Sequence, residues 1–254
     1  MVKLTIIAFS FMGHKVADTW LRSIKAQRYR WWEAILIESR GDIGRISTWH
    51  GDKRKPHVKE VKPPSSRNDA LNMGLAMATG DVICLLPINF ALKTADVFGR
   101  VAEIMEDPEV DLVCGDIEVN KTDGKTGLKT PLAASGHLRM AKEMLPQAGC
   151  LFVRADWWHY FGGLETCYRR SAEFARMIDL ISQPGIEIRY ANEVLVTQLQ
   201  EEPSQESHTL LKSLEEIRVA SSKGRFWSYV KSRRAIKASQ HGAGVLRSEL
   251  PWPN

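Results

Sequence analysis

Short apolar runs alternate with stretches in which apolar residues recur every three or four positions. The apolar and β-branched runs are typical of strands that are buried on both faces. They predict strands at residues 4–9, 34–37, 57–61, 82–86, 112–115 and 149–154. The helical spacing predicts helices at residues 16–27, 66–80, 95–105, 155–161 and 172–181. Ser66 suits the N-cap of the second helix, and Asp69 follows it in the position of a capping box.

This alternation predicts an α/β fold with a mostly parallel central sheet flanked by helices, formed by residues 1–200. Right-handed crossovers bring the carboxyl ends of parallel strands to one edge of the sheet. Ligands bind at that edge in open sheets. We therefore expect the functional side chains directly after the strands and in the helices that begin there. Residues 39–44 are expected to form a turn, and residues 120–132 an exposed loop.

The composition changes near residue 201 and predicts a separate helical, basic C-terminal extension over residues 201–254. From residue 223 onward this extension carries seven lysines and arginines against Glu249 alone, with Phe226, Trp227 and Tyr229 interleaved. The pattern is compatible with a helix on a membrane surface, with a solvated helix that covers the core, or with a nucleic-acid patch. No nucleic-acid recognition motif accompanies the charge, so we expect no nucleic-acid partner.

The overall composition narrows the class of protein only a little. The chain has 254 residues, of which 44% are hydrophobic, and a formal net charge of +5, which suits an anionic ligand or surface. The four cysteines lie far apart and predict neither a zinc site nor a disulfide framework. No apolar stretch is long enough to span a bilayer, and no signal peptide is expected. We expect a cytoplasmic location, with peripheral contact at the inner face of the membrane as the option that the basic segment leaves open.

Three blocks of residues carry a resemblance to a known family. The first contains the run at 4–9, the polar turn that begins at Ser10, Leu21-Arg22-Ser23-Ile24, Gln27-Arg28-Tyr29 and the run that ends at Glu38. The second contains Asp69-Ala70-Leu71-Asn72-Met73-Gly74 and Ala78-Thr79-Gly80-Asp81. The third contains Phe152-Val153-Arg154, Gly162-Gly163-Leu164-Glu165 and Ala172-Glu173-Phe174. In this order, over residues 3–182, they resemble the family 2 glycosyltransferases, which have the GT-A type of nucleotide-sugar-binding fold.

The resemblance implies a nucleotide-diphospho-sugar donor held by Ser10, Glu38, Arg67, Asp69, Asn72 and Asn89. Glu38, where the family usually has Asp, would accept a hydrogen bond from the nucleotide base. Asp69 and Asn72 share a helix face that would border the diphosphate and sugar, although Ser66 and Asp69 are equally compatible with simple helix capping. Arg67, at the same helix N-terminus, is a candidate contact for phosphate.

Glu173 takes the place of the family's catalytic base. Inverting sugar transfer needs a carboxylate that accepts the proton of the attacking hydroxyl. The alternative is a carboxylate that only stabilises the N-terminus of its helix. Trp157 and Trp158 are compatible with stacking on an acceptor sugar or with core packing.

The sequence departs most from the family after the run at 82–86, where an acidic metal-binding motif is replaced by Pro87-Ile88-Asn89-Phe90. Asn89 is the one candidate ligand left for Mg²⁺ or Mn²⁺, so weak metal binding is predicted. Two functions remain open. One is an inverting, hexosyltransferase-like enzyme of polysaccharide biosynthesis, which transfers a sugar to a saccharide or lipid-linked acceptor. The other is a catalytically inactive relative that acts as a nucleotide- or sugar-binding or scaffolding module.

Overall fold

The computed structural model describes residues 1–11, 16–53, 55–120, 126–129, 151–169 and 171–199, together with residues 216, 218, 219 and 222. The strands are β1 (Leu4–Phe11), β2 (Trp32–Arg40), β3 (Ile43–His50), β4 (His57–Val61), β5 (Val82–Leu85), β6 (Phe90–Leu92), β7 (Leu112–Asn120), β8 (Thr126–Lys129), β9 (Leu151–Arg154) and β10 (Ile188–Gln198). The helices are α1 (Val16–Lys25), α2 (Arg67–Met77), α3 (Val97–Met105), α5 (Ala155–Phe161) and α6 (Ala172–Ile181).

The described strands form one ten-stranded sheet in the order β4-β3-β2-β1-β5-β9-β7-β10-β6, with β8 paired to β7. Only β1 with β2, β1 with β5 and β7 with β10 pair in parallel. The prediction of an α/β fold is therefore confirmed, but a mostly parallel sheet is wrong because the sheet is mixed. The antiparallel pairings come from the meander of β2, β3 and β4, from β9, which runs opposite to both of its neighbours, and from β6 and β8, which pair antiparallel to β10 and β7.

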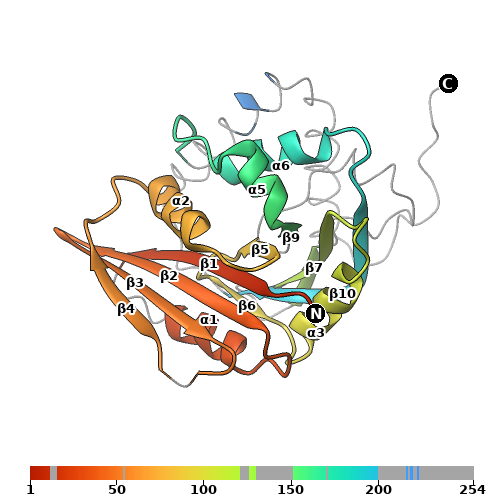
Figure 1. Ribbon diagram of the computed structural model, residues 1–254, viewed down its shortest axis with the longest axis horizontal. Helices are drawn as coiled ribbons and strands as arrows, with labels where there is room; N and C mark the ends of the chain where they lie inside the picture. The colour runs from red at the N-terminus through yellow and green to blue at the C-terminus, as the bar shows by residue number, and fades with distance from the viewer. Residues whose placement is uncertain are drawn as a thin grey trace.

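The sheet has a helical layer on each face (Figure 1). Helices α2, α5 and α6 pack on one face, and α1 and α3 pack on the other. Each face has its own apolar core because successive residues of a strand point to opposite sides. In β2, for example, Ile35 and Ile37 join the core beneath α2, whereas Ala34 and Leu36 join the core beneath α1.

Helix α2 begins as predicted, because the side chain of Ser66 accepts a hydrogen bond from the Asp69 amide at 3.1 Å. It ends at Met77 rather than at Gly80. Gly80 serves instead where the chain passes close to β1. A Cβ atom there would lie 2.5 Å from the Thr5 hydroxyl oxygen, which accepts the Gly80 amide hydrogen at 3.0 Å.

Most of the predicted C-terminal extension, and most of the predicted loop at 120–132, lie outside the described residues. Val219 is fully buried in the core beneath α2, α5 and α6. The boundary between a domain at 1–200 and an extension at 201–254 stays a prediction. Among the described residues, no helix is both long and apolar enough to cross a bilayer.

Candidate active site

Glu38 lies near the carboxyl end of β2, directly opposite Ser10 on β1 and Arg45 on β3. Ser10 and Glu38 are both buried. One oxygen of Glu38, Oε2, accepts hydrogen bonds from both Nε (2.8 Å) and Nη2 (2.5 Å) of Arg45. Strand alternation places Glu38 on the α1 side of the sheet, as it does Leu36. Glu38, the candidate contact for the nucleotide base, is therefore part of an ion pair at the edge of the sheet.

Glu173 and Arg67 contact each other on the opposite face of the sheet, where α2 and α6 pack. Arg67 is the first residue of α2, Glu173 lies in the first turn of α6, and Nη2 of Arg67 is 2.5 Å from Oε1 of Glu173. Glu173 is only 8% exposed. Burial works to lower the pKa of Arg67, but the charge and the hydrogen bond of Glu173 outweigh it and leave that pKa above its ordinary value. The two helix N-termini thus converge on one ion pair.

Two other predicted site residues make hydrogen bonds that organise the fold. The Asp69 carboxylate accepts a hydrogen bond from the hydroxyl of Ser65, beside the cap that Ser66 provides. Asn72 bonds twice to the backbone of Leu164: Oδ1 accepts its amide hydrogen at 2.7 Å, and Nδ2 donates to its carbonyl at 2.9 Å. These contacts favour the capping interpretation of Asp69. Contact of either residue with a donor stays a prediction.

Gly163 explains why the Gly-Gly segment precedes Glu173. Its φ of +86° is a conformation that side chains disfavour, and a Cβ atom would lie 2.6 Å from Oδ1 of Asn72. Arg176 of α6 also donates to the Gly163 carbonyl, at 2.7 Å. The segment is therefore fixed to α2 through Asn72 and to α6 through Arg176, and this fixes where α6 begins.

The arginine of the Phe-Val-Arg block has a structural role. Arg154 donates to the carbonyl groups of Met105, Asp107 and Val110, at and just beyond the C-terminus of α3. A guanidinium satisfies carbonyls that a helix end leaves unpaired. This part of the resemblance reflects packing of the fold.

The segment after β5 does not fit a resident divalent metal. Phe90 is buried and begins β6, and the backbone carbonyl of Asn89 accepts the Leu199 amide hydrogen at 2.7 Å. Within the described part of the chain, no group of three or more His, Cys, Asp or Glu side chains could hold a metal ion. Mg²⁺ and related ions are held through carboxylates, water and substrate phosphates, and one side-chain amide does not supply that set.

Two side chains of interest escaped the sequence interpretation. Arg45 was not singled out, because residues 39–44 were expected to form a turn and no strand was predicted where β3 lies. Asp116 is buried on β7, where its Oδ1 accepts a hydrogen bond from Tyr190 Oη at 2.5 Å. Alternation along β7 places it on the α6 side, with Leu112 and Cys114. Its position just after the apolar run 112–115 was the available signal.

The two tryptophans of α5 are accounted for by packing. Trp157 donates its indole hydrogen to Asp111, which immediately precedes β7, at 2.8 Å. Trp158 is 8% exposed and belongs to the core beneath α5. Both positions support the core-packing interpretation over stacking on a sugar.

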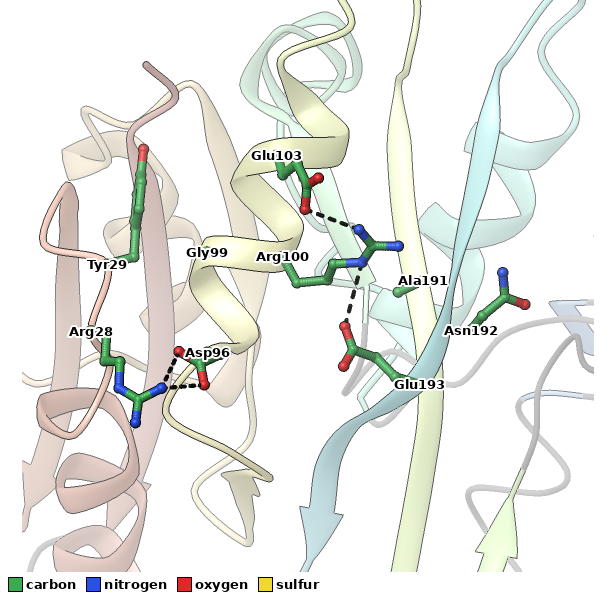
Figure 2. A pocket seen from close by; sticks show the side chains of 9 residues that line it. All are labelled: Arg28, Tyr29, Asp96, Gly99, Arg100, Glu103, Ala191, Asn192 and Glu193. Atoms are coloured by element: carbon green, nitrogen blue, oxygen red, sulfur yellow. Dashed lines mark hydrogen bonds and ion pairs between the residues drawn. The ribbon is translucent and has the colours of Figure 1, made fainter.

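A pocket of about 800 Å³ lies elsewhere, between α3, β10 and the chain that leads into β2 (Figure 2). Its charges are paired: Arg28 contacts Asp96 at 2.7 Å, and Arg100 contacts Glu103 at 2.9 Å and Glu193 at 3.7 Å. Figure 2 shows Arg100 between its two carboxylates. The pocket is near the amino ends of β1 and β2, so it is not part of the candidate site.

The fold is that of glycosyltransferases with a GT-A-like architecture. A mannosyltransferase, PcManGT from Pyrobaculum calidifontis in complex with GDP-Man and Mn²⁺, superposes with a TM-score of 0.61 at 13% identity over 96% of this chain and 76% of that one. Residues 1–349 of S. aureus TarS in complex with UDP-GlcNAc superpose with a TM-score of 0.60 at 9% identity over 88% of this chain and 71% of that one. No protein-family model matches the sequence, and neither does the sequence of any curated protein.

Proposed function

We propose that this protein is an inverting glycosyltransferase of the family 2 type. It would move a hexose from a nucleotide-diphospho-sugar to a saccharide or lipid-linked acceptor. The observation that carries the proposal is the Arg67–Glu173 ion pair, buried on the glutamate side, at two converging helix N-termini in a glycosyltransferase fold. The similar structures that hold GDP-Man and UDP-GlcNAc support a nucleotide sugar as the donor class.

The proposed donor lies across the carboxyl edge of the sheet. Glu38 and Ser10 are on the α1 side of this edge, whereas Arg67 and Glu173 are on the side of α2 and α6. A donor with its base near Glu38 therefore crosses the ends of β1 and β5 to bring its sugar to Glu173. The diphosphate then lies close to the N-terminus of α2, where backbone N–H groups and the helix dipole favour an anion.

In the proposed reaction, the acceptor hydroxyl oxygen forms a bond to the anomeric carbon while the bond from that carbon to the diphosphate oxygen breaks. The electron pair of the broken bond leaves with the nucleoside diphosphate. The hydroxyl proton passes to the Glu173 carboxylate, which acts as general base. Attack from the side opposite to the leaving group inverts the anomeric configuration.

Arg67 has a second role in this scheme, as counter-charge to the leaving diphosphate. Such charge is normally balanced by a metal ion or by fixed cations. The residues at 87–90 do not fit a resident Mg²⁺ or Mn²⁺ ion, so the scheme includes no step through a metal. A guanidinium can donate two hydrogen bonds to a phosphate group. Donor binding then draws Arg67 partly away from Glu173, and Glu173 becomes a stronger base.

The acceptor and the cellular setting are further parts of the proposal. A basic, aromatic extension at 201–254 suits a peripheral position at the cytoplasmic face of a membrane. A lipid-linked acceptor would be within reach there, which fits polysaccharide biosynthesis. Co-sedimentation with acidic and neutral lipid vesicles tests this part, because electrostatic attachment should be lost in high salt.

The decisive experiment measures donor binding and turnover separately. A thermal-shift screen of nucleotide sugars identifies the donor, because a ligand of the folded state raises its melting temperature. Release of nucleoside diphosphate is then measured with Glu173→Gln, and with Glu103→Gln on the exposed face of α3 as the matched control. The first variant should lose about 10²-fold or more of the rate while it still binds donor. The control should be unchanged.

Two outcomes would contradict the proposal that this protein is an enzyme. If no nucleotide sugar stabilises the protein, the donor proposal fails. If a donor binds but neither wild type nor variant turns over, the protein is a non-catalytic binding module, which the replacement at 87–90 independently favours. An active Glu173→Gln variant would remove Glu173 from the mechanism.

A further inference from the structure

The pairing of Glu38 with Arg45 restricts which nucleotide base this edge can bind. Nε and Nη2 of Arg45 both donate to the same oxygen, Oε2. Among the described residues, none donates a hydrogen bond to the other oxygen, Oε1. The Glu38 side chain is 10% exposed and the Arg45 side chain 41% exposed. The pair thus offers a ligand one acceptor oxygen and the remaining N–H groups of one guanidinium.

We infer that Arg45 is a specificity-determining residue and that the base is a pyrimidine with an imide edge, uracil or thymine. The inference rests on the proposed function, since it concerns the base of the same donor. An imide edge presents one N–H between two carbonyl groups. Glu38 Oε1 accepts that N–H, and the guanidinium of Arg45 donates to a neighbouring carbonyl. In this arrangement Oε1 of Glu38 accepts from the base and Arg45 donates to it.

The same pair disfavours guanine. Guanine presents two adjacent donors, N1–H and the exocyclic amine, beside one carbonyl. Two adjacent donors are best matched by both oxygens of one carboxylate. Arg45 already occupies Oε2, so a guanine amine would remain unpaired or would have to break the ion pair. A buried donor without a partner costs affinity.

Adenine and cytosine present an amine beside an unprotonated ring nitrogen. Their amine is a weaker donor to an anionic oxygen than an imide N–H, whose acidity is increased by two flanking carbonyl groups. Adenine also lacks the carbonyl that the guanidinium would contact. Both bases should therefore bind less tightly than uracil.

The test measures dissociation constants of UDP, dTDP, GDP, CDP and ADP for the full chain by calorimetry. UDP or dTDP should bind about 10- to 100-fold more tightly than GDP, the range expected for one hydrogen bond to a charged group. Comparison of UDP with dTDP distinguishes the two imide bases. Equal or tighter binding of GDP, CDP or ADP would overturn the inference and leave the proposed function intact. If none of the five diphosphates binds, the proposed function itself fails.

Substitution of Arg45 provides the sharper result. Arg45→Met keeps an unbranched apolar stem but releases Oε2 of Glu38. UDP should then bind about 10-fold more weakly and GDP more tightly, so the preference of the protein for UDP over GDP should shrink or reverse. Arg45→Lys, which keeps a cation but not two adjacent donor nitrogens, provides a second test if the Met variant is unstable. Arg28→Met, at an exposed pair remote from the site, is the control. An unchanged ratio of UDP to GDP in both Arg45 variants would refute a role of Arg45 in base selection.

Discussion

The ion pair between Arg67 and Glu173 should be visible as a coupling energy between two substitutions. Arg67→Met and Glu173→Gln each remove one charge and keep most of the side-chain volume. Each single variant leaves the other group without its partner, Glu173 in a buried place and Arg67 in a partly buried one. The double variant leaves no unpaired charge, so it should lose less stability than the sum of the two single losses.

The expected magnitude follows from the exposure of the two side chains. Exposed pairs contribute about 0.2–1 kcal/mol, whereas removing one partner of a fully buried pair costs about 3–5 kcal/mol. The Glu173 side chain is 9% exposed and the Arg67 side chain 36% exposed, so this pair lies between these limits. Solvent screening on the arginine side reduces the upper value, and we expect a coupling of about 1–3 kcal/mol.

The assay is urea unfolding of wild type, both single variants and the double variant at neutral pH. The matched control is the pair Arg100–Glu103 on α3, whose side chains are 44% and 68% exposed. Its coupling should stay below about 0.5 kcal/mol. A coupling for Arg67 and Glu173 no larger than that of the control would show that the two side chains are not paired in solution. The reasoning about the catalytic site would then lose its main support.

Three further predictions concern other residues of the structure. Asn72→Ala should destabilise the fold by about 2–4 kcal/mol in urea unfolding, because it leaves the amide and carbonyl of Leu164 unpaired; a loss below about 1 kcal/mol would contradict this link. Glu33 has a pKa below the ordinary value of 4.5: burial works to raise it, but hydrogen bonds from Thr79 and Thr5 and the charge of Lys3 outweigh burial. Its ionisation therefore stabilises the fold above pH 4.5. The stability that Glu33→Gln loses should be largest at neutral pH and should shrink as the pH falls through the pKa of Glu33 in the folded state. A loss that does not depend on pH would refute this. Titration of Mn²⁺ into the nucleotide-free protein should show only weak binding, since Asn89 is one neutral ligand, whereas tight stoichiometric binding would place the metal site elsewhere.

Much of the architecture was predictable because strands β1, β2 and β5 are buried on both faces and therefore read as continuous apolar runs. Strand β10 was missed because it contains a register shift near Asn192, whose φ is +57°, and so has no regular period. The directions of the strands were predicted wrongly for a different reason. Local pattern fixes which segments form strands, but the pairing of β9 between β5 and β7 depends on contacts that are distant in sequence.

The site was predictable only in part, for a related reason. Position after a strand, or in the first turn of a helix, selected Glu38, Arg67 and Glu173 when it was combined with the family resemblance. Their pairing was not predictable. Arg45 is seven residues from Glu38 but on the next strand, and Arg67 meets Glu173 only because α2 and α6 pack on the same face of the sheet.

Two of the three carboxylates selected from sequence, Glu38 and Glu173, are each held by an arginine, and this has a consequence for the proposed reaction. A carboxylate paired with a guanidinium is a weaker base than an unpaired one. If the diphosphate of the donor competes for Arg67, donor binding and the basicity of Glu173 are coupled. Coupling between two sites is reciprocal, so protonation of Glu173 must strengthen diphosphate binding by the same factor. A donor that binds more tightly at low pH in wild type, but not in Glu173→Gln, would therefore be the equilibrium signature of a base that is activated by its own substrate.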